Sequence, residues 1–304
     1  NTCQITCNML VYYYIFTLVY YRTKECSVRE GGLSMNNTII SMKEKELRFL
    51  KFFHQQKYNV VDFNLIEELD WRRLTHEDLQ QMDERSFWQQ NKSIYALRND
   101  FTDQLFRYYS NYPTHFKKVA YAGDIIRDNR VIKQVGIENY EPQFDKITQN
   151  FLDFQYFIQN VLHDDIQFVI LGHYQLIDAL LEKNHQTREV MEMIEERNLS
   201  GLIQTLTFNH PIIQILKENT LNQLKILSHY LPEQHPAMGS IQSWAQWFTD
   251  HGITEIHLDV TAQAPRSYYK GIFIKCHLKN TTHSVLTGGY YHGSLEGFGL
   301  GLTL

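Results

Sequence analysis

Two alternating runs of apolar and polar residues flank a short turn in residues 121–138, and this pattern constrains the fold more than any other stretch of the chain. Side chains on a strand alternate sides with a period of two, so Gln134, Gly136 and Glu138 share one face of the second run. Gly136 leaves that face open, with Gln134 and Glu138 about 13 Å apart along the strand. The pattern predicts a hairpin whose polar face is either the floor of a small-ligand pocket or a solvated sheet surface.

The patterns elsewhere predict an α+β fold, in which an antiparallel sheet is backed by helices. Leucine and isoleucine at helical spacing in residues 174–231 predict an inserted helical subdomain. Thr102 is the expected N-cap of the second helix, and Gly252 the expected C-cap of the last. We expect helices at residues 41–57, 102–109, 144–162 and 240–251, and further strands at 59–63, 93–97, 167–171, 255–261, 267–276 and 283–289.

Composition excludes several classes of protein. A net charge of -5 over 304 residues does not indicate a dominant basic surface of the kind that binds nucleic acid. The 14 histidines are scattered without metal-ligand spacing, and no glycine-rich phosphate loop occurs, so neither a metal site nor a standard nucleotide loop is predicted. After residue 35 the chain contains a single cysteine, Cys276, which makes no intramolecular disulfide and indicates a cytoplasmic protein.

Residues 1–34 differ from the rest of the chain. They contain Cys3, Cys7 and Cys26 and an apolar run, MLVYYYIFTLVYY, which is short for a membrane span of about 20 residues. The codons for residues 30–32 are able to read GAAGGAGG, a ribosome-binding sequence two codons before Met35. We therefore expect residues 1–34 to be a translated upstream leader outside the fold, with a membrane anchor as the alternative.

Four blocks in residues 35–304 resemble the catalytic core of class II aminoacyl-tRNA synthetases, and within that class the histidyl-tRNA synthetase family. They are YALRNDFT at 95–102, YAGDIIR with KQVGIE at 121–138, SYYKGIF at 267–273, and GGYYHG with GFGLGLTL at 288–304. Their order and spacing match those of the family. The resemblance implies a class II synthetase-like antiparallel sheet flanked by helices, with the helical insertion at about 174–231.

The resemblance also implies a histidine-binding site. Asp100 takes the place of a glutamate that holds the substrate amino group, and Arg127 matches the arginine on the carboxylate or α-phosphate. Gln134 and Glu138 match the pair that reads histidine. The predicted histidine-binding residues, which include a tyrosine pair beside the imidazole, are Asp100, Arg127, Gln134, Glu138, Tyr268 and Tyr269.

The residues that activate the amino acid in the family are missing. The family's arginine in the tyrosine block falls on Ala264, with Arg266 two places later in a non-equivalent position, and the arginine of the last motif falls on Leu304. Another arginine and an aspartate are replaced by Tyr290 and His292. Because adenylyl transfer depends on positive charge near the phosphates, we expect adenylation to be absent or feeble and no residue to be catalytic.

A histidine pocket without adenylation, on a chain that stops before an anticodon-binding domain, resembles the regulatory subunits of ATP phosphoribosyltransferase. That resemblance implies a short catalytic subunit as partner, a homodimer within a hetero-oligomer, L-histidine as effector, and no cofactor, tRNA or membrane. An adenylate-forming ligase is the enzymatic alternative. A scaffold with a decayed pocket is the other, because Asn99, Asp100 and Phe101 depart from the family pattern and the bulky Phe101 narrows the expected pocket.

Overall fold

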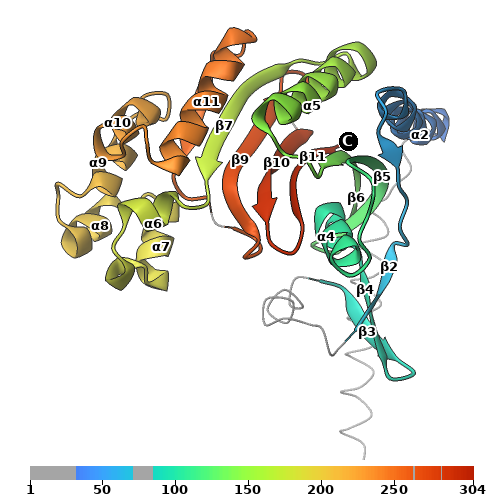
Figure 1. Ribbon diagram of the computed structural model, residues 1–304, viewed down its shortest axis with the longest axis horizontal. Coiled ribbons are helices and arrows are strands. Elements are labelled where there is room, and N and C mark those ends of the chain that lie inside the picture. The colour runs from blue at the N-terminus through green and yellow to red at the C-terminus, as the bar shows by residue number, and fades with distance from the viewer. Residues whose placement is uncertain (1–31, 71–84, 263, 282) are drawn as a thin grey trace, which may run out of the picture. The chain divides into compact units, whose positions relative to one another are not determined.

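The computed structural model describes residues 32–70, 85–262, 264–281 and 283–304 (Figure 1). The chain divides into two compact units, Asn1–Glu44 and Lys45–Leu304. The described part of the first unit is the beginning of helix α2 (Gly32–Gln55). The predicted leader lies outside the described residues except for positions 32–34, which are helical. Everything described below belongs to the second unit.

An eight-stranded sheet, in the order β1-β5-β6-β11-β10-β9-β7-β8, forms the centre of this unit (Figure 1). Its strands are β1 (Asn59–Val60), β5 (Lys118–Arg127), β6 (Arg130–Asn139), β7 (Ile166–His173), β8 (Ile256–Asp259), β9 (Tyr269–Leu278), β10 (Val285–His292) and β11 (Glu296–Thr303). The predicted hairpin is confirmed as β5 and β6, joined at Asp128 and Asn129. The sheet is mostly antiparallel, as predicted, but β1 with β5 and β7 with β8 are parallel pairs.

A separate three-stranded antiparallel sheet has the order β2-β4-β3. It comprises β2 (Ile66–Leu69), β3 (Phe87–Gln90) and β4 (Ser93–Leu97). The backbone of Arg98, directly after β4, links it to the main sheet, since the Arg98 carbonyl accepts a hydrogen bond from Ile126 N of β5 at 2.8 Å. This small sheet was not predicted from the sequence, apart from β4.

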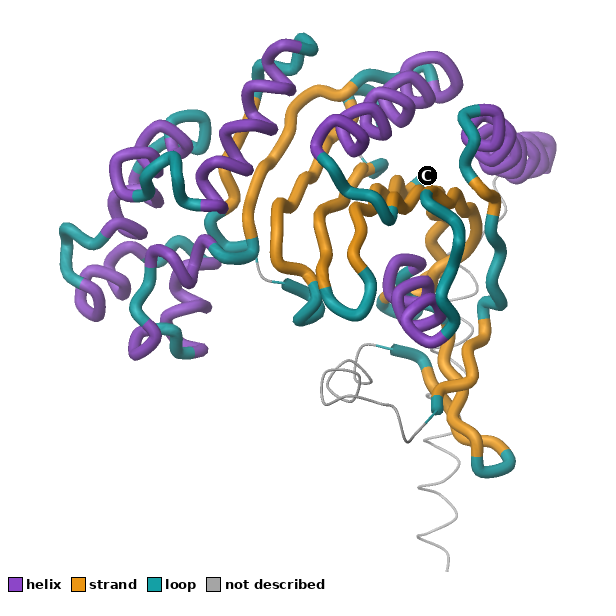
Figure 2. Tube along the Cα trace, viewed as in Figure 1, coloured by secondary structure: helices purple, strands orange, loops and turns teal. Residues whose placement is uncertain are grey.

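Helices cover both faces of the main sheet (Figure 2). On one face, α5 (Phe144–Phe157), α11 (Pro236–Asp250) and the second half of α2 enclose the larger hydrophobic core. Phe49 of α2 packs edge-on against Phe157 of α5, with ring centroids 5.0 Å apart. On the other face α4 (Phe101–Asn111) packs on β5, where Phe101 stacks on Tyr121 at 4.3 Å. The polar face of β6 is therefore turned toward α4.

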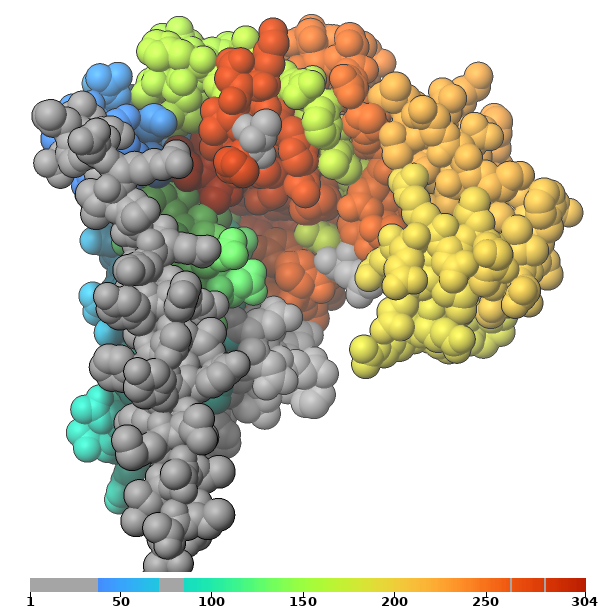
Figure 3. All heavy atoms as spheres, turned by 180° about the vertical axis from the view of Figure 1, so that it is seen from behind, coloured from blue at the N-terminus to red at the C-terminus, as the bar shows by residue number. Residues whose placement is uncertain are grey.

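The helical insertion is confirmed between β7 and α11, and in Figure 3 it forms the yellow to orange lobe beside the strands. Its helices are α6 (Leu176–Leu180), α7 (Arg188–Glu195), α8 (Leu199–Leu206), α9 (Pro211–Lys217) and α10 (Gln223–Tyr230). Helices α7, α8 and α9 begin with side-chain N-caps. The side chains of Thr187, Asn198 and His210 each accept a hydrogen bond from a backbone N–H of the first turn. Within the described residues, no helix has the length and apolar character needed to cross a membrane.

The predicted N-cap of α4 is wrong. Asp100, rather than Thr102, has extended backbone angles and accepts a hydrogen bond from Asp103 N at 3.0 Å. An aspartate caps a helix at least as well as a threonine, and its charge is favoured at the positive end of the helix dipole. The hydroxyl of Thr102 instead donates a hydrogen bond to the carboxyl group of Glu138 on β6.

Candidate functional site

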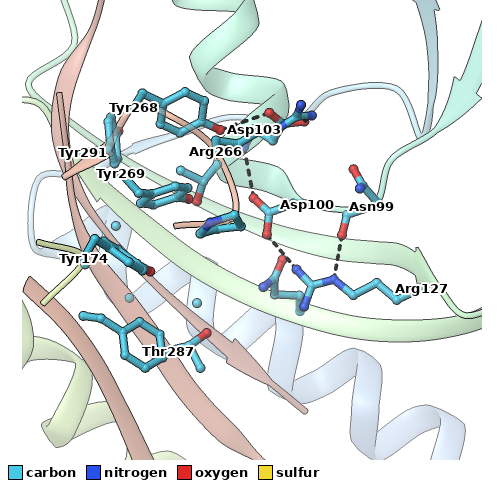
Figure 4. A pocket seen from close by; sticks show the side chains of 18 of the residues that line it. Asn99, Asp100, Asp103, Arg127, Tyr174, Arg266, Tyr268, Tyr269, Thr287 and Tyr291 are labelled. Carbon is cyan, nitrogen blue, oxygen red and sulfur yellow. Dashed lines mark hydrogen bonds and ion pairs between the residues drawn. The ribbon is translucent and has the colours of Figure 1, made fainter. Parts of the chain in front are cut away.

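A cavity of about 330 Å³ opens on the α4 face of the main sheet (Figure 4). Its size lies at the small end of the range typical of small-molecule sites. The lining residues are Asn99, Asp100, Thr102, Asp103, Tyr121, Arg127, Gln134, Tyr174, Pro265, Arg266, Tyr268, Tyr269, Phe273, Thr287, Gly288, Gly289, Tyr291, Gly299 and Gly301. Five of the six predicted site residues therefore lie together in one cavity, and the exception is Glu138.

The space above Gly136 is not open. A Cβ atom at this position would lie 2.4 Å from the hydroxyl oxygen of Tyr121, which extends across the glycine from the neighbouring strand. The expected floor is instead provided by β11, where Gly299 and Gly301 leave room for the side chains of Glu138 and Gln134. The sequence pattern placed the polar face correctly but did not reveal which side chain covers it.

Glu138 lies behind the cavity wall and is fully buried. Its carboxyl group accepts hydrogen bonds from three hydroxyls, those of Thr102 at 2.6 Å, Tyr291 at 3.1 Å and Tyr121 at 3.4 Å. Burial raises the pKa of Glu138 to about 8, although these hydroxyls oppose the shift. Burial thus favours the neutral acid, which lies against the hydroxyls of two tyrosines that line the cavity.

Gln134 lines the cavity and is only 7% exposed. Its carboxamide oxygen is buried and has no hydrogen-bond partner among the described residues. A buried acceptor without a partner costs about 1–3 kcal/mol. A ligand that carries an N–H group would recover this energy by donating to Gln134.

Asp100 and Arg127 form an ion pair at the mouth of the cavity, with 2.7 Å between Asp100 Oδ2 and Arg127 Nη2 (Figure 4). The same guanidinium donates from Nε to the carbonyl oxygen of Asn99 at 2.9 Å. Desolvation raises the pKa of Asp100, while the charge of Arg127 acts to lower it. The arginine side chain is 49% exposed, so this pair is screened by water and can open at little energetic cost.

A second pair of opposite charges was not expected from the sequence. Arg266, which is 6% exposed, donates from Nη2 to Asp103 Oδ2 at 2.9 Å. Tyr268 donates to the other oxygen of Asp103 at 3.0 Å. Burial acts to raise the pKa of Asp103, but Arg107 and Arg266 outweigh it and hold this pKa below its usual value.

Arg266 lines the cavity, a place that the sequence interpretation did not assign to it. In the sequence comparison the family's arginine falls on Ala264, and Arg266 takes a non-equivalent position two places later. Arg266 nonetheless reaches the same cavity from the loop before β9, whereas Ala264 does not line it. Its short distance in sequence from Tyr268 was the available signal, since both lie at the entry to one strand.

Aromatic residues form the remaining wall. Tyr268 stacks on Phe106 of α4 with ring centroids 3.9 Å apart, and Tyr269 lies 5.8 Å from the ring of Tyr174. Burial raises the pKa of both Tyr268 and Tyr269 well above the ordinary tyrosine value, so their hydroxyls stay protonated. The wall therefore offers flat apolar surfaces together with neutral hydroxyl donors.

Phe101 does not narrow the cavity. It is fully buried beneath the sheet-facing side of α4, between Tyr121 and the guanidinium of Arg98, which lies 3.7 Å from the ring centroid. The sequence had suggested that its bulk would reduce the pocket, but its side chain is directed into the core.

Comparison with known proteins identifies the family. The histidyl-tRNA synthetase family profile matches residues 38–301. An ATP phosphoribosyltransferase regulatory subunit of Staphylococcus epidermidis is 98% identical over 270 residues, which are 89% of this chain and all of that protein. The protein of the same name from Staphylococcus aureus is 58% identical over 272 residues, again 89% of this chain and all of that protein.

The fold is also found in a solved structure of the ATP phosphoribosyl transferase (HisG:HisZ) complex from Thermotoga maritima. One chain of it aligns with a TM-score of 0.67 and 17% identity, over 86% of this chain and 97% of that chain. Sequence and fold thus agree, and the chain belongs to the ATP phosphoribosyltransferase regulatory subunits, a family built on the histidyl-tRNA synthetase fold.

Proposed function

We propose that this regulatory subunit binds the short catalytic subunit of ATP phosphoribosyltransferase and adjusts its rate by sensing L-histidine in the cavity beside α4. The product of the pathway would then control the first step of histidine biosynthesis. Histidine would bind one state of the assembly more tightly than another, and the ratio of the two affinities would set the extent of inhibition.

The observation that carries the proposal is the composition of the cavity. Asp100 and Arg127 are paired with each other at its mouth, and a zwitterionic amino acid supplies an ammonium for the carboxylate and a carboxylate for the guanidinium. Arg266 is a second guanidinium on the same wall. The ligand therefore exchanges a solvent-exposed ion pair for two charge-assisted hydrogen bonds of its own.

The inner part of the cavity suits an imidazole. The carboxamide oxygen of Gln134, which no other described residue uses, would accept a hydrogen bond from a ring N–H, and the aromatic wall of Tyr268 and Tyr269 would pack against the flat ring. A buried acceptor that is left unsatisfied discriminates against side chains without a donor. An aliphatic amino acid of similar size would not donate a hydrogen bond to the carboxamide oxygen of Gln134.

Sensing rather than activation fits the charges of the cavity. Arg127 and Arg266 each pair with a carboxylate, Asp100 and Asp103 respectively. Tyr290 and His292, which stand in the places of charged residues of the synthetase family, lie near Glu296 on the exposed end of the β10–β11 hairpin. This arrangement offers little free positive charge for the phosphates of ATP.

The further partners follow the family resemblance. We propose a homodimer inside a hetero-oligomer with the catalytic subunit, with no tRNA in the assembly. A cytoplasmic location agrees with Cys276, which is buried as a free thiol in the described part of the chain.

Co-purification with the short catalytic subunit, followed by rate measurements with and without L-histidine, tests the proposal. We expect a stable complex, a higher rate with this chain than without it, and inhibition by histidine. Histidinol, which lacks the carboxylate for Arg127, is the matched control ligand and should inhibit at least tenfold less well.

Two results would contradict the proposal. If the chain restores the rate but calorimetry detects no binding of L-histidine to the complex, the chain acts as a scaffold. Histidine-dependent exchange of pyrophosphate into ATP by the purified chain would instead support the adenylate-forming ligase.

A further inference from the structure

A buried row of alternating charges runs from the cavity to the small sheet. Asp103 accepts hydrogen bonds from both Arg266 and Arg107, and Arg107 also donates to Glu67 of β2 at 2.7 Å. Glu67 in turn accepts from Arg85, just before β3. We call Arg266, Asp103, Arg107, Glu67 and Arg85 the charge chain.

The charge chain is shielded from water. The side chains of Arg266, Asp103, Glu67 and Arg85 are 5%, 8%, 10% and 5% exposed, and that of Arg107 is 24% exposed. Buried charges interact far more strongly than surface ones, and leaving one without a partner is strongly destabilising. A change in the strength of one ion pair therefore alters the strength of the adjacent ion pairs.

Two of its members are shared between partners. Oδ2 of Asp103 holds two guanidiniums at once, and the guanidinium of Arg107 bridges two carboxylates. Strengthening one bond of a shared group weakens the other. The charge chain therefore connects two cavities. Asp103 lines the ligand cavity, whereas Glu67 and Arg107 line a second cavity of about 490 Å³ between α4 and β2.

We propose that Arg107 is a positioning residue that couples occupancy of the ligand cavity to the small sheet β2-β4-β3. This inference rests on the proposed histidine site, since it names the route by which that site is read. A carboxylate in the cavity attracts Arg266 as well as Arg127. The ion pair between Asp103 and Arg107 then becomes stronger, and the ion pair between Arg107 and Glu67 becomes weaker. Because Glu67 belongs to β2, the hydrogen-bonded pairing of β2 with β4 becomes less stable.

The other bonds around α4 make this route specific. Gln104, one residue after Asp103, bonds the carbonyl oxygen of Asn64 just before β2 at 3.0 Å. This second attachment is uncharged, and neither Gln104 nor Asn64 lines the ligand cavity. A ligand that acts through charge therefore reaches β2 through Arg107.

Amide hydrogen exchange on the full chain, with calorimetry on the same samples, tests the coupling. Saturating L-histidine should speed exchange in the β2–β4 ladder at least fivefold, while exchange in the β9–β10 ladder slows or stays constant. In Arg107→Met the effect on β2–β4 should disappear although calorimetry still detects histidine. Arg188→Met is the matched control, because Arg188 forms the same kind of i,i+4 pair with Glu192 but is 92% exposed; it should behave like the original chain.

A second variant keeps the test decisive if Arg107→Met does not fold. Glu67→Gln retains the shape of the side chain and removes the charge at the far end, so it should also abolish the histidine effect on β2–β4. Uniform slowing of exchange in both ladders, unchanged in either variant, would indicate general stabilisation by the ligand and would overturn the inference.

A ligand-free arm separates this inference from the proposed function. Arg266→Gln leaves Asp103 with Arg107 as its guanidinium partner, which imitates the ligand-bound state. Exchange in β2–β4 should speed up without any histidine, and the change should vanish in the double variant with Arg107→Met. If calorimetry shows no histidine binding, the proposed function fails while this arm still decides the coupling; unchanged exchange in Arg266→Gln would refute it.

Discussion

The phenol ring of Tyr121 occupies the space that a side chain at Gly136 would need, with 2.4 Å between the Tyr121 hydroxyl oxygen and an added Cβ. The two residues are paired across β5 and β6. Tyr121 is 1% exposed, and its ring is also held by the stack on Phe101. Tyr121 also forms part of the cavity wall, so this contact fixes the position of a lining residue.

Gly136→Ala should therefore destabilise the fold. The added methyl group has to displace a buried ring, and overpacking of this kind costs about 1–3 kcal/mol of unfolding free energy. Urea unfolding measures the change. Val131→Ala on the same strand is the control, since Val131 is 66% exposed and should shift stability by less than about 0.5 kcal/mol. Equal stability of the two variants would show that Tyr121 moves freely.

Asp100→Asn separates the two roles of Asp100. Asparagine caps a helix about as well as aspartate, so the free energy of unfolding should change by less than about 0.5 kcal/mol. The charge that would hold the ligand's ammonium is lost, however, and calorimetry should show at least a tenfold weaker affinity for L-histidine. Asp145→Asn, in the first turn of α5, is the control and should leave affinity unchanged. Unaltered binding in Asp100→Asn would remove Asp100 from the site.

Gln134→Met should weaken ligand binding without destabilising the protein. The carboxamide oxygen of Gln134 is buried and has no hydrogen-bond partner in the part of the chain that the structure describes. Replacing it by an apolar group of similar shape should leave stability unchanged or raise it by up to about 1 kcal/mol. Histidine loses the acceptor for its ring N–H, so its affinity should fall about tenfold or more. A loss of stability instead would indicate that Gln134 is satisfied in the ligand-free protein.

Glu138 should give the protein an unusual pH dependence. Its pKa rises from the ordinary value of 4.5 to about 8 on folding, so the folded state binds the extra proton. The stability that it contributes is complete below pH 4.5 and is lost as pH rises toward 8, at up to about 1.4 kcal/mol per pH unit. Unfolding by urea at pH 5 and pH 8 measures this loss.

Glu138→Gln removes the titration and should make stability at pH 8 higher than in the original chain, while the difference shrinks at pH 5. The amide oxygen still accepts a hydrogen bond from a hydroxyl of the cluster. Parallel curves for the two proteins between pH 5 and 8 would mean that Glu138 is ionised in the fold.

Much of the fold was readable because strand and helix patterns are local. The alternation in residues 121–138 predicted β5 and β6, and the apolar spacing of residues 144–162 predicted α5 together with its last turn, which is a π-helix at Ile158–Leu162. The small sheet was missed except for β4. Its strands β2 and β3 are four residues each and expose much of their surface, so they carry no clear hydrophobic pattern.

The site was predicted in part. Local alternation placed Gln134 and Glu138 on the polar face, and the resemblance to the synthetase family gathered Asp100, Arg127, Tyr268 and Tyr269 around it. The sequence did not show that Glu138 lies behind the wall. That arrangement depends on Tyr291 and Thr102, whose hydroxyls come from distant segments.

The sequence by itself determined which residues form the hairpin and which side each one faces, because the strand geometry of a few neighbouring residues decides both. Only the tertiary structure decided that Tyr121 covers Gly136, that Arg266 reaches Asp103 across 163 residues, and that Arg107 joins the cavity to β2. These contacts arise from the order of strands in the sheet and from the packing of α4. No local pattern encodes the distance between residues that folding brings together.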